Sequence, residues 1–259
     1  MKACFPQLDP AQRKTFADKS SEELGISLAE TFLVWFRDHR RFLEDRLSVE
    51  GQEHLDWALD QERGIILISC HFGCVDINGA LLSMMPRRDR LLFGTYRKTD
   101  EIINRFLWQF RGKYIDVMIS ASDQRGIVRA LKKNNLVWYA PDIEVKNRSS
   151  AFVDFMGVKA STTLAISRLA KVTKAIVIPV AHYRQNDKPE YTFKFFEPLK
   201  DFPTADPEAD TLKVNQAIEK MIEPYPERYW WAIKRFKNRP EGEPSIYNGI
   251  ARSRGSKKT

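Results

Sequence analysis

Residues 64–180 alternate between short apolar runs and longer segments with the spacing of amphipathic helices. The apolar runs are rich in isoleucine, valine and aromatic residues, which favour strands. Strand, helix and strand in this rhythm predict an α/β fold with a mostly parallel central sheet, flanked by helices on both faces. The predicted strands cover residues 64–70, 90–96, 115–120, 135–140 and 175–180, and the clearest helices cover 101–112 and 162–172.

The segment before the first of these strands predicts a long amphipathic helix. Ser20 and Glu23 have the spacing of a capping box, which marks a helix start. Two interpretations stay open for the apolar stripe that follows: it packs into the core while the basic face is solvated, or it contacts a membrane or a protein partner. The stripe consists of Leu24, Leu28, Phe32, Trp35 and Phe36.

A length of 259 residues with 43% hydrophobic content favours one domain with a full core. We expect this domain to span residues 1–250, with a helical N-terminal part at 1–60. A proline-containing loop at 202–210 precedes a last helical region. The basic tail at 251–259 is predicted to be disordered.

The net charge of +8 favours an anionic partner, and nucleic acid, an anionic membrane surface and an acidic carrier protein all meet that description. No apolar run approaches the roughly 20 residues that a transmembrane helix needs. The cysteines predict no disulfide framework, because Cys70 and Cys74 lie too close together within one turn. We therefore expect a reducing, cytoplasmic compartment.

His71 directly follows the apolar run at 64–70, so it would lie at the carboxyl end of a parallel strand, where α/β proteins place their ligands. On a single helix the side chains of His71 and Asp76 would point about 140° apart. They meet only if His71 lies in a turn and Asp76 in the following helix, with Gly73 allowing the tight turn. Asp76 would then hold one ring nitrogen and leave the other as a general base.

Two other chemistries use the same stretch. Cys70 or Cys74 would act as a nucleophile activated by His71, or Cys70, His71 and Cys74 would form half of a metal site. A zinc site needs about four ligands, and the sequence has no second cluster of cysteine and histidine. We therefore predict neither a metal nor a cofactor.

Further motifs follow His71 and Asp76 along the chain. They are Tyr96-Arg97, Ala140-Pro141-Asp142, the run from Arg148 to Val158, Thr162-Thr163 with Ser167-Arg168-Leu169-Ala170, Ile178-Pro179-Val180, and the run from Pro226 to Pro240. In this order they resemble the late acyltransferases of lipid A biosynthesis, of the lauroyl and myristoyl type, within the glycerolipid acyltransferase superfamily. The chain departs from the family where an Asp-x-Asp-x-Gly-like run is replaced by Asp142-Ile143-Glu144-Val145-Lys146.

The resemblance implies a glycerolipid-acyltransferase-like fold and transfer of an acyl chain from acyl carrier protein to a hydroxyl of a lipid A precursor. His71 would be the general base and Asp76 its partner, without a covalent acyl-enzyme. Backbone amides near Gly73 are the candidates for stabilising the oxyanion. The residues expected to bind substrate are Arg97, Arg148, Asp142 and Glu144.

Members of this family usually begin with a membrane-anchoring helix, and residues 4–13 resemble the segment that follows it, so we expect this anchor to be absent. The protein would then be peripheral on the cytoplasmic face of the inner membrane, attracted by anionic lipid. An acyltransferase for another lipid acceptor, such as a glycerophosphate or a glycolipid, fits the same motifs. A nucleic-acid-binding protein would explain the charge, but it gives Asp76 no role and no nucleic-acid motif is present, so we expect no nucleic acid partner.

Overall fold

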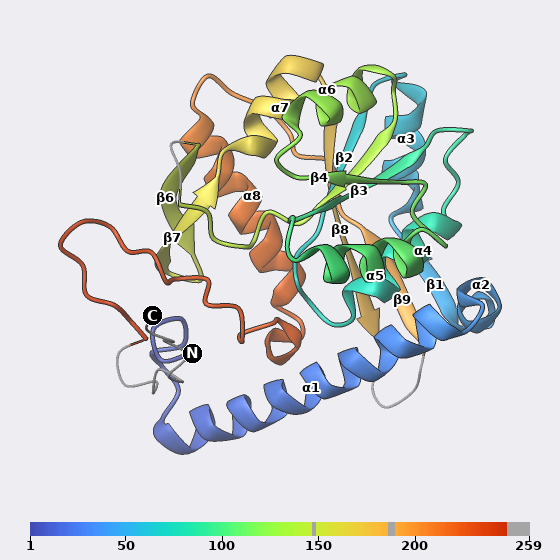
Figure 1. Cartoon of the computed structure of the whole chain (residues 1–259). Helices are drawn as coiled ribbons and strands as arrows, with labels where there is room; N and C mark the ends of the chain where they lie inside the picture. Colours follow the sequence, from blue (N-terminus) through green and yellow to red (C-terminus); the bar gives the residue numbers. More distant parts are fainter. Residues whose placement is uncertain (147–148, 186–189, 248–259) are drawn as a thin grey trace, which may run out of the picture.

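The computed structural model describes residues 1–146, 149–185 and 190–247 (Figure 1). The helices are α1 (Pro10–Phe36), α2 (His39–Leu43), α3 (Gln52–Asp60), α4 (Val75–Met84), α5 (Glu101–Arg111), α6 (Gln124–Lys132), α7 (Ala165–Thr173) and α8 (Pro207–Ile222), with short 3-10 helices η1 (Glu44–Arg46) and η2 (Pro226–Arg228). The strands are β1 (Leu47–Glu50), β2 (Ile65–Ile68), β3 (Leu92–Tyr96), β4 (Val117–Ser120), β5 (Leu136–Tyr139), β6 (Ser150–Phe155), β7 (Val158–Thr163), β8 (Ile176–Arg184) and β9 (Tyr191–Phe195).

A seven-stranded sheet in the order β1-β9-β8-β2-β5-β3-β4 forms the centre of the fold. Neighbouring strands run parallel except for β8 and β9, which are antiparallel. The predicted α/β class with a mostly parallel sheet is therefore confirmed, and the five predicted strands correspond to β2, β3, β4, β5 and β8. The sequence did not predict β1 and β9, because their short runs alternate with polar residues and lack a long apolar signal.

Both faces of the sheet are covered by helices, as the alternation of side chains along β2 requires. Ile65 and Leu67 pack with α3 and α4 on one face. Ile66 and Ile68 point to the opposite face and pack with α6, α7 and α8. Burial of each of these side chains stabilises the fold by about 1.5–3 kcal/mol, so β2 is firmly held within the sheet. The candidate site is built at the carboxyl end of this strand.

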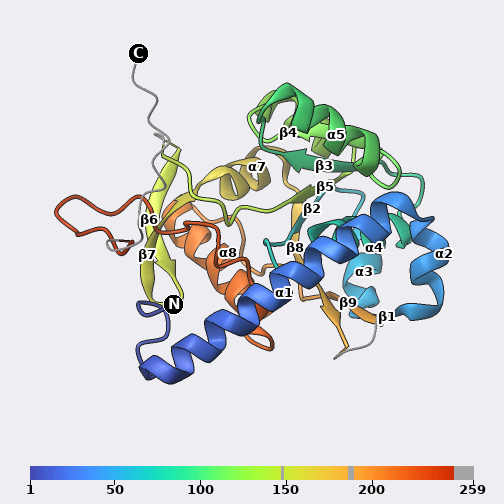
Figure 2. The same ribbon diagram turned by 60° about the horizontal axis from the view of Figure 1, so that its bottom comes forward.

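Helix α1 lies across the outside of α4 as a long rod (Figure 2). The predicted start at Ser20 is wrong: the helix begins at Pro10, where Asp9 and Gln12 form a reciprocal capping box. Ser20 is instead buried within the helix. The interpretation of the apolar stripe as core is also wrong at three positions, because Leu28, Phe32 and Phe36 are 54%, 56% and 63% exposed.

The C-terminal part of the chain folds back onto the centre of the molecule. The hairpin of β6 and β7 packs on α8, and the segment after η2 reaches the turn behind β2 through an isolated bridge between Phe72 and Tyr229. Within the described part of the chain, no helix has the length and apolar character needed to cross a membrane. The tail at 251–259 lies outside the described residues.

Candidate active site

His71 lies in a tight turn between β2 and α4. The turn continues the pairing with β5, since the backbone amide of Ser69 donates to the carbonyl of Tyr139 at 3.0 Å. Gly73 has a φ of +52°, and a Cβ atom there would lie 2.9 Å from Nε2 of His182. Both the backbone conformation and the close approach of His182 therefore require glycine at this position.

Asp142 is the partner of His71. Its Oδ1 lies 2.8 Å from Nδ1 of the imidazole, and its Oδ2 accepts a hydrogen bond of 2.9 Å from the backbone amide of His71. Asp142 follows β5, which pairs with β2, so the two residues meet at the carboxyl ends of adjacent parallel strands. The His71 side chain is 19% exposed and that of Asp142 is fully buried. This arrangement leaves Nε2 of His71 as the nitrogen available to a substrate.

The environment of Asp142 keeps its carboxyl group ionised. Burial alone would raise the pKa of Asp142, but the charge and hydrogen bonds of His71, with a smaller effect of Arg235, lower it below its ordinary value. Arg235 is itself buried, and its guanidinium donates to the carbonyl of Ser161 at 2.8 Å and to Oγ1 of Thr162 at 2.6 Å. An ionised Asp142 accepts the Nδ1 proton and so leaves the lone pair on Nε2.

Asp76 does not hold His71, so the predicted pairing of these two residues is wrong. Asp76 lies in the first turn of α4, and its carboxylate faces α1 and α5. Its oxygens accept hydrogen bonds from Nε1 of Trp35 at 2.9 Å, from Nε and Nη2 of Arg111 at 2.9 and 3.1 Å, and from the Tyr114 hydroxyl. Burial would raise the pKa of Asp76, but Arg111, with Tyr114 and Trp35, lowers it. Asp76 thus joins three helical segments around the site.

The C-terminal segment supports the turn that carries His71. The backbone amide of Trp230 donates to the carbonyl of His71 at 2.9 Å, and its indole Nε1 donates to the carbonyl of Gly73 at 2.8 Å. The Trp230 ring also lies 5.6 Å from the imidazole, centroid to centroid. The sequence did not predict this contact. Its only sign in the sequence is the C-terminal motif from Pro226 to Pro240, which contains Trp230.

Three backbone amides of the turn that carries His71 are already engaged within the protein. The amide of His71 donates to Asp142, that of Phe72 to the carbonyl of Cys70, and that of Gly73 to the carbonyl of Arg228. The amide of Gly73 is therefore not free to bind an oxyanion in this conformation, and a contribution of other backbone amides near Gly73 stays a prediction.

The remaining predicted substrate-binding residues lie in different surroundings. Arg97 is exposed just beyond β3, which is separated from β2 by β5. Glu144 is half-buried and accepts a hydrogen bond of 2.8 Å from the backbone amide of Asn238. Arg148 lies outside the described residues. Asp142 has no exposed surface, so its expected contact with substrate is replaced by its contact with His71.

The thiols are poorly suited to nucleophilic attack. Burial raises the pKa of Cys70 well above its ordinary value and raises the pKa of Cys74 to about 12. Cys74 is fully buried, where its Sγ accepts from the amide of Ile77 at 3.4 Å and contacts Oγ1 of Thr31 at 3.3 Å. Over residues 1–146, 149–185 and 190–247, no group of three or more potential ligand side chains is arranged to hold a metal ion.

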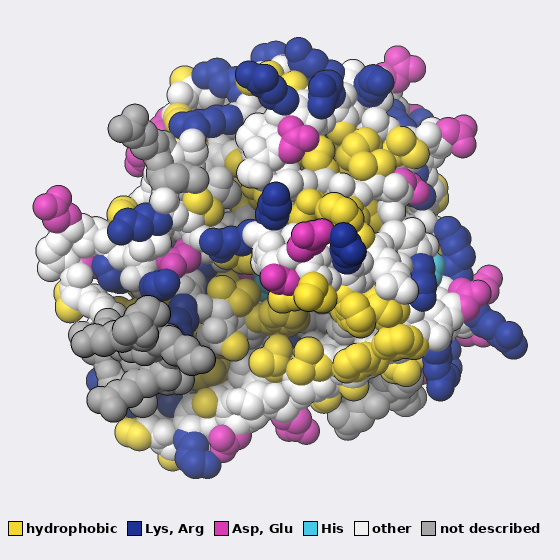
Figure 3. Space-filling view, in the orientation of Figure 1, with side chains coloured by type: hydrophobic (Ala, Val, Ile, Leu, Met, Phe, Trp, Pro, Cys, Tyr) yellow, Lys and Arg dark blue, Asp and Glu magenta, His cyan; other side chains and the backbone are white. Residues whose placement is uncertain are grey.

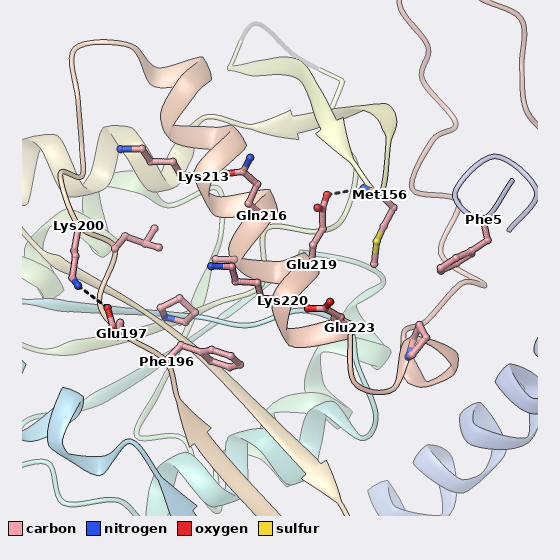
Figure 4. Close-up of a pocket in the computed structure, with 14 residues that line it drawn as sticks. Phe5, Met156, Phe196, Glu197, Lys200, Lys213, Gln216, Glu219, Lys220 and Glu223 are labelled. Carbon is pink, nitrogen blue, oxygen red and sulfur yellow. Dashed lines mark hydrogen bonds and ion pairs between the residues drawn. The ribbon is translucent and has the colours of Figure 1, made fainter. Parts of the chain in front are cut away.

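A separate groove of about 920 Å³ lies along α8 (Figure 4). None of its lining residues is a predicted site residue. Its charged side chains are mixed in sign, and Lys200 pairs with Glu197 at 2.7 Å while Glu219 accepts from the amide of Met156 at 2.6 Å. This groove therefore has neither the general base nor the uniform charge that an anionic substrate would need.

Comparison with known sequences identifies the family to which this chain belongs. Residues 1–238 match the sequence model of the family described as bacterial lipid A biosynthesis acyltransferase. The chain is 33% identical over 249 residues to the lipid A biosynthesis lauroyltransferase of Escherichia coli (strain K12), covering 95% of this chain and 80% of that protein. It is 31% identical over 250 residues to the lipid A biosynthesis palmitoleoyltransferase of the same organism, covering 95% and 79%.

A lipid A biosynthesis myristoyltransferase of Escherichia coli (strain K12) is 23% identical over 246 residues, covering 94% of this chain and 75% of the relative. Among solved structures, the 1-acyl-sn-glycerophosphate acyltransferase PlsC from Thermotoga maritima gives a TM-score of 0.31 at 11% identity, covering 78% of this chain and 88% of that chain. That score is too low to compare residue positions between the two chains.

Proposed function

Since this chain belongs to the bacterial lipid A biosynthesis acyltransferases, we propose that it transfers a fatty acyl chain from an acyl carrier protein thioester to a hydroxyl of a lipid A precursor, with His71 as the general base. The observation that carries the mechanism is the hydrogen bond from Nδ1 of His71 to the buried Asp142. It orients the ring and leaves Nε2 unprotonated at the carboxyl edge of the sheet, where a substrate can reach it.

In the proposed reaction, Nε2 of His71 takes the proton of the acceptor hydroxyl while the hydroxyl oxygen attacks the thioester carbonyl. Asp142 stabilises the imidazolium that forms, because its carboxylate lies 2.8 Å from Nδ1. Collapse of the tetrahedral intermediate breaks the carbon–sulfur bond, and the imidazolium returns the proton to the leaving thiolate. A positioned general base of this kind contributes about 10²–10⁴-fold to the rate.

Asp76 acts indirectly in this proposal. Its contacts with Trp35 on α1 and Arg111 on α5 hold both helices against α4, whose N-terminus follows the His71 turn. In this proposal His71 is the general base, and Asp76, five residues later, holds the helices that pack beside the His71 turn. Asp76 is a positioning residue.

The acceptor is recognised through its phosphates. Arg97, exposed beyond the end of β3, is suited to charge-assisted hydrogen bonds with a phosphate, and we assign the same role to Arg148 from the family resemblance. Glu144, whose carboxylate accepts from the amide of Asn238, ties the loop after β5 to the C-terminal segment. The net charge of +8 favours both an acidic carrier protein and an anionic membrane surface. We place the enzyme as a peripheral protein on the cytoplasmic face of the inner membrane.

The test is to incubate the full chain with acyl carrier protein loaded with several chain lengths and a lipid A precursor, and to identify the products by mass spectrometry. We expect a precursor that is heavier by one acyl group, and no such product with His71→Ala. A parallel reaction with glycerol-3-phosphate examines the alternative acceptor class. Transfer to glycerol-3-phosphate without transfer to the lipid A precursor would contradict the proposed acceptor, and transfer by neither would contradict the proposed activity.

A further inference from the structure

A buried arginine without a carboxylate partner lies near the candidate site. Arg235 is only 1% exposed, whereas Lys and Arg side chains stand out across the surface in Figure 3. Its guanidinium donates to the carbonyl of Ser161 and to Oγ1 of Thr162, and its Cζ lies 5.3 Å from the centroid of the Phe155 ring. Within the described part of the chain, no carboxylate forms an ion pair with it. A buried charge is costly unless other charges compensate it, and Asp142 is the fully buried carboxylate in its surroundings.

We propose that Arg235 is a positioning residue of the proposed acyl transfer: its buried positive charge keeps Asp142 ionised and opposes protonation of the pair formed by His71 and Asp142. This role rests on the proposed function, because it assigns Arg235 to the general base of that reaction. Arg235 acts through Asp142, since a fully buried side chain cannot itself meet a substrate. An ionised Asp142 in turn holds the Nδ1 proton of His71 and leaves Nε2 free.

The loop that carries Asp142 is joined to Arg235 through β7. Ser161 of that strand makes both contacts. Its hydroxyl donates to the carbonyl of Val145, which lies in the same loop as Asp142, and its own carbonyl accepts from the guanidinium of Arg235 at 2.8 Å. The position of the guanidinium and the position of the loop therefore depend on one residue. This places the positive charge beside the element that presents the carboxylate to His71.

Few of the titratable groups around the guanidinium carry a charge at neutral pH. Besides each other, the groups that act on Arg235 or Asp142 are Cys70, His71, Glu144, Tyr229 and Tyr247. Burial raises the pKa of Cys70 and of Tyr229 well above their ordinary values, and it also raises the pKa of Tyr247. The thiol and the two phenols are therefore neutral. The charges that remain beside the imidazole are the guanidinium and the two carboxylates.

The two fully buried charges stabilise each other. Burial raises the pKa of Asp142, and the charge and hydrogen bonds of His71, followed by the charge of Arg235, lower it. Burial likewise lowers the pKa of Arg235, and the charge of Asp142 is among the influences that oppose this effect. Charges in the interior are screened less than charges on the surface. Removal of the guanidinium charge would therefore make protonation of the pair easier, whichever of the two residues takes the proton.

The experiment follows the imidazole of His71 in the full chain by NMR as the pH is varied, with carbon-labelled histidine and with His71→Gln to assign the signal. In Arg235→Gln we expect the midpoint of this titration to lie about half a pH unit or more above that of the wild type. Arg235→Lys keeps the charge and should restore the wild-type midpoint. The matched control is Arg239→Gln, in the same segment, because this side chain is 12% exposed and has its own partner in Glu243. We expect the control to leave the midpoint unchanged.

The pH dependence of kcat/KM for acyl transfer is the second measurement. Protonation of the pair removes the general base, so activity falls on the acid side of the profile. This fall should move to higher pH in Arg235→Gln by the same amount as the NMR midpoint, and it should return to its wild-type position in Arg235→Lys. A purely structural role of Arg235 would lower the denaturation midpoint of Arg235→Gln and move neither curve.

An NMR midpoint of Arg235→Gln equal to that of the wild type would overturn the proposal, and so would an equal shift in Arg239→Gln. If Arg235→Gln does not fold, Glu144→Gln decides, because its amide oxygen can still accept from the amide of Asn238. Loss of this negative charge leaves Arg235 less compensated, so the midpoint should move to lower pH, and an unchanged or higher midpoint would overturn the proposal. The expected NMR shift without any acyl transfer by the wild type would leave the charge of Arg235 assigned to Asp142 and contradict the enzymatic function.

Discussion

Asp142 binds His71 twice, once through the backbone amide at 2.9 Å and once through Nδ1 of the ring at 2.8 Å. The double contact ties the position of the turn to the orientation of the imidazole, so both depend on one buried carboxylate. Asp142 is fully buried and the His71 side chain is 19% exposed, so in the proposed mechanism only the imidazole can meet the substrate.

We expect His71→Ala to abolish acyl transfer and Asp142→Asn to lower kcat by about 100-fold or more, because the amide no longer selects the tautomer with a free Nε2. Steady-state kinetics of the two variants, with circular dichroism as a check of folding, give the measurement. Asp154→Asn, at an exposed ion pair with Lys159, is the matched control. Folded Asp142→Asn with wild-type kcat would show that His71 needs no carboxylate partner.

Asp76→Asn should damage the protein in a different way. The substitution leaves Arg111, whose side chain is only 17% exposed, without its charge partner, and we expect a loss of about 3 kcal/mol in the free energy of unfolding. Asp142→Asn acts mainly on kcat, whereas Asp76→Asn should lower the denaturation midpoint and loosen α1. Urea unfolding together with kinetics distinguishes the two. An unchanged midpoint with lost activity would return Asp76 to a direct role in catalysis.

The sequence pattern located the central strands and placed His71 at the edge of the sheet, because apolar runs of β-branched residues report directly on burial. It did not identify the partner of His71. Asp142 is distant in sequence, and the choice between Asp76 and Asp142 depends on which way the first turn of α4 faces. That direction is set by Trp35, Arg111 and Tyr114, which a local motif does not contain.

The orientation of α1 was also beyond local reasoning. The apolar spacing of α1 is compatible with a stripe that faces the core and with one that faces outward. The rotation of the helix is determined by Glu30, which binds Tyr191 of β9 and Arg184 of β8, both distant in sequence. The contacts of Trp230 with the turn are likewise tertiary. The sequence pattern therefore pointed to His71, whereas its contacts with Asp142 and Trp230 depend on the tertiary structure.

Trp230→Phe tests the support of the turn by the C-terminal segment. The variant keeps an aromatic ring beside His71 but removes the hydrogen bond of 2.8 Å from the indole to the carbonyl of Gly73. We expect a loss of about 1 kcal/mol in stability and a lower kcat, because the turn is held less firmly. Trp57→Phe, at an exposed indole, is the control. Equal kcat for Trp230→Phe and wild type would show that the backbone contacts alone hold the turn.

Replacing the thiols should leave the chemistry intact. Cys70→Ala and Cys74→Ala, made separately, are expected to retain substantial kcat, because burial raises the pKa of both thiols and the direct-transfer mechanism uses neither. Each cavity should cost stability but not turnover. Mass spectrometry of the wild type quenched during turnover is the direct measurement: an acyl adduct on either cysteine would overturn the direct mechanism.

His182 should make the protein sensitive to mild acid. It is fully buried beneath Gly73, and burial, with the charges of Arg228 and Arg184, lowers its pKa to about 3. The unfolded chain has a histidine pKa of about 6.5, so between those values the unfolded state binds more protons than the folded state. The free energy of unfolding must therefore rise with pH in that window and reach its full value above about pH 6.5.

The measurement compares urea unfolding of the wild type and His182→Gln between pH 4 and 7. Carboxylates titrate in both proteins, so the difference between the two slopes isolates His182, and we expect the wild type to lose about 1.4 kcal/mol per pH unit more than the variant below pH 6. His182→Gln will be less stable at neutral pH if the glutamine packs poorly, but the slope is independent of that offset. Parallel curves for wild type and variant would mean that His182 is protonated in the folded protein, and that a charge is accommodated directly beneath the His71 turn.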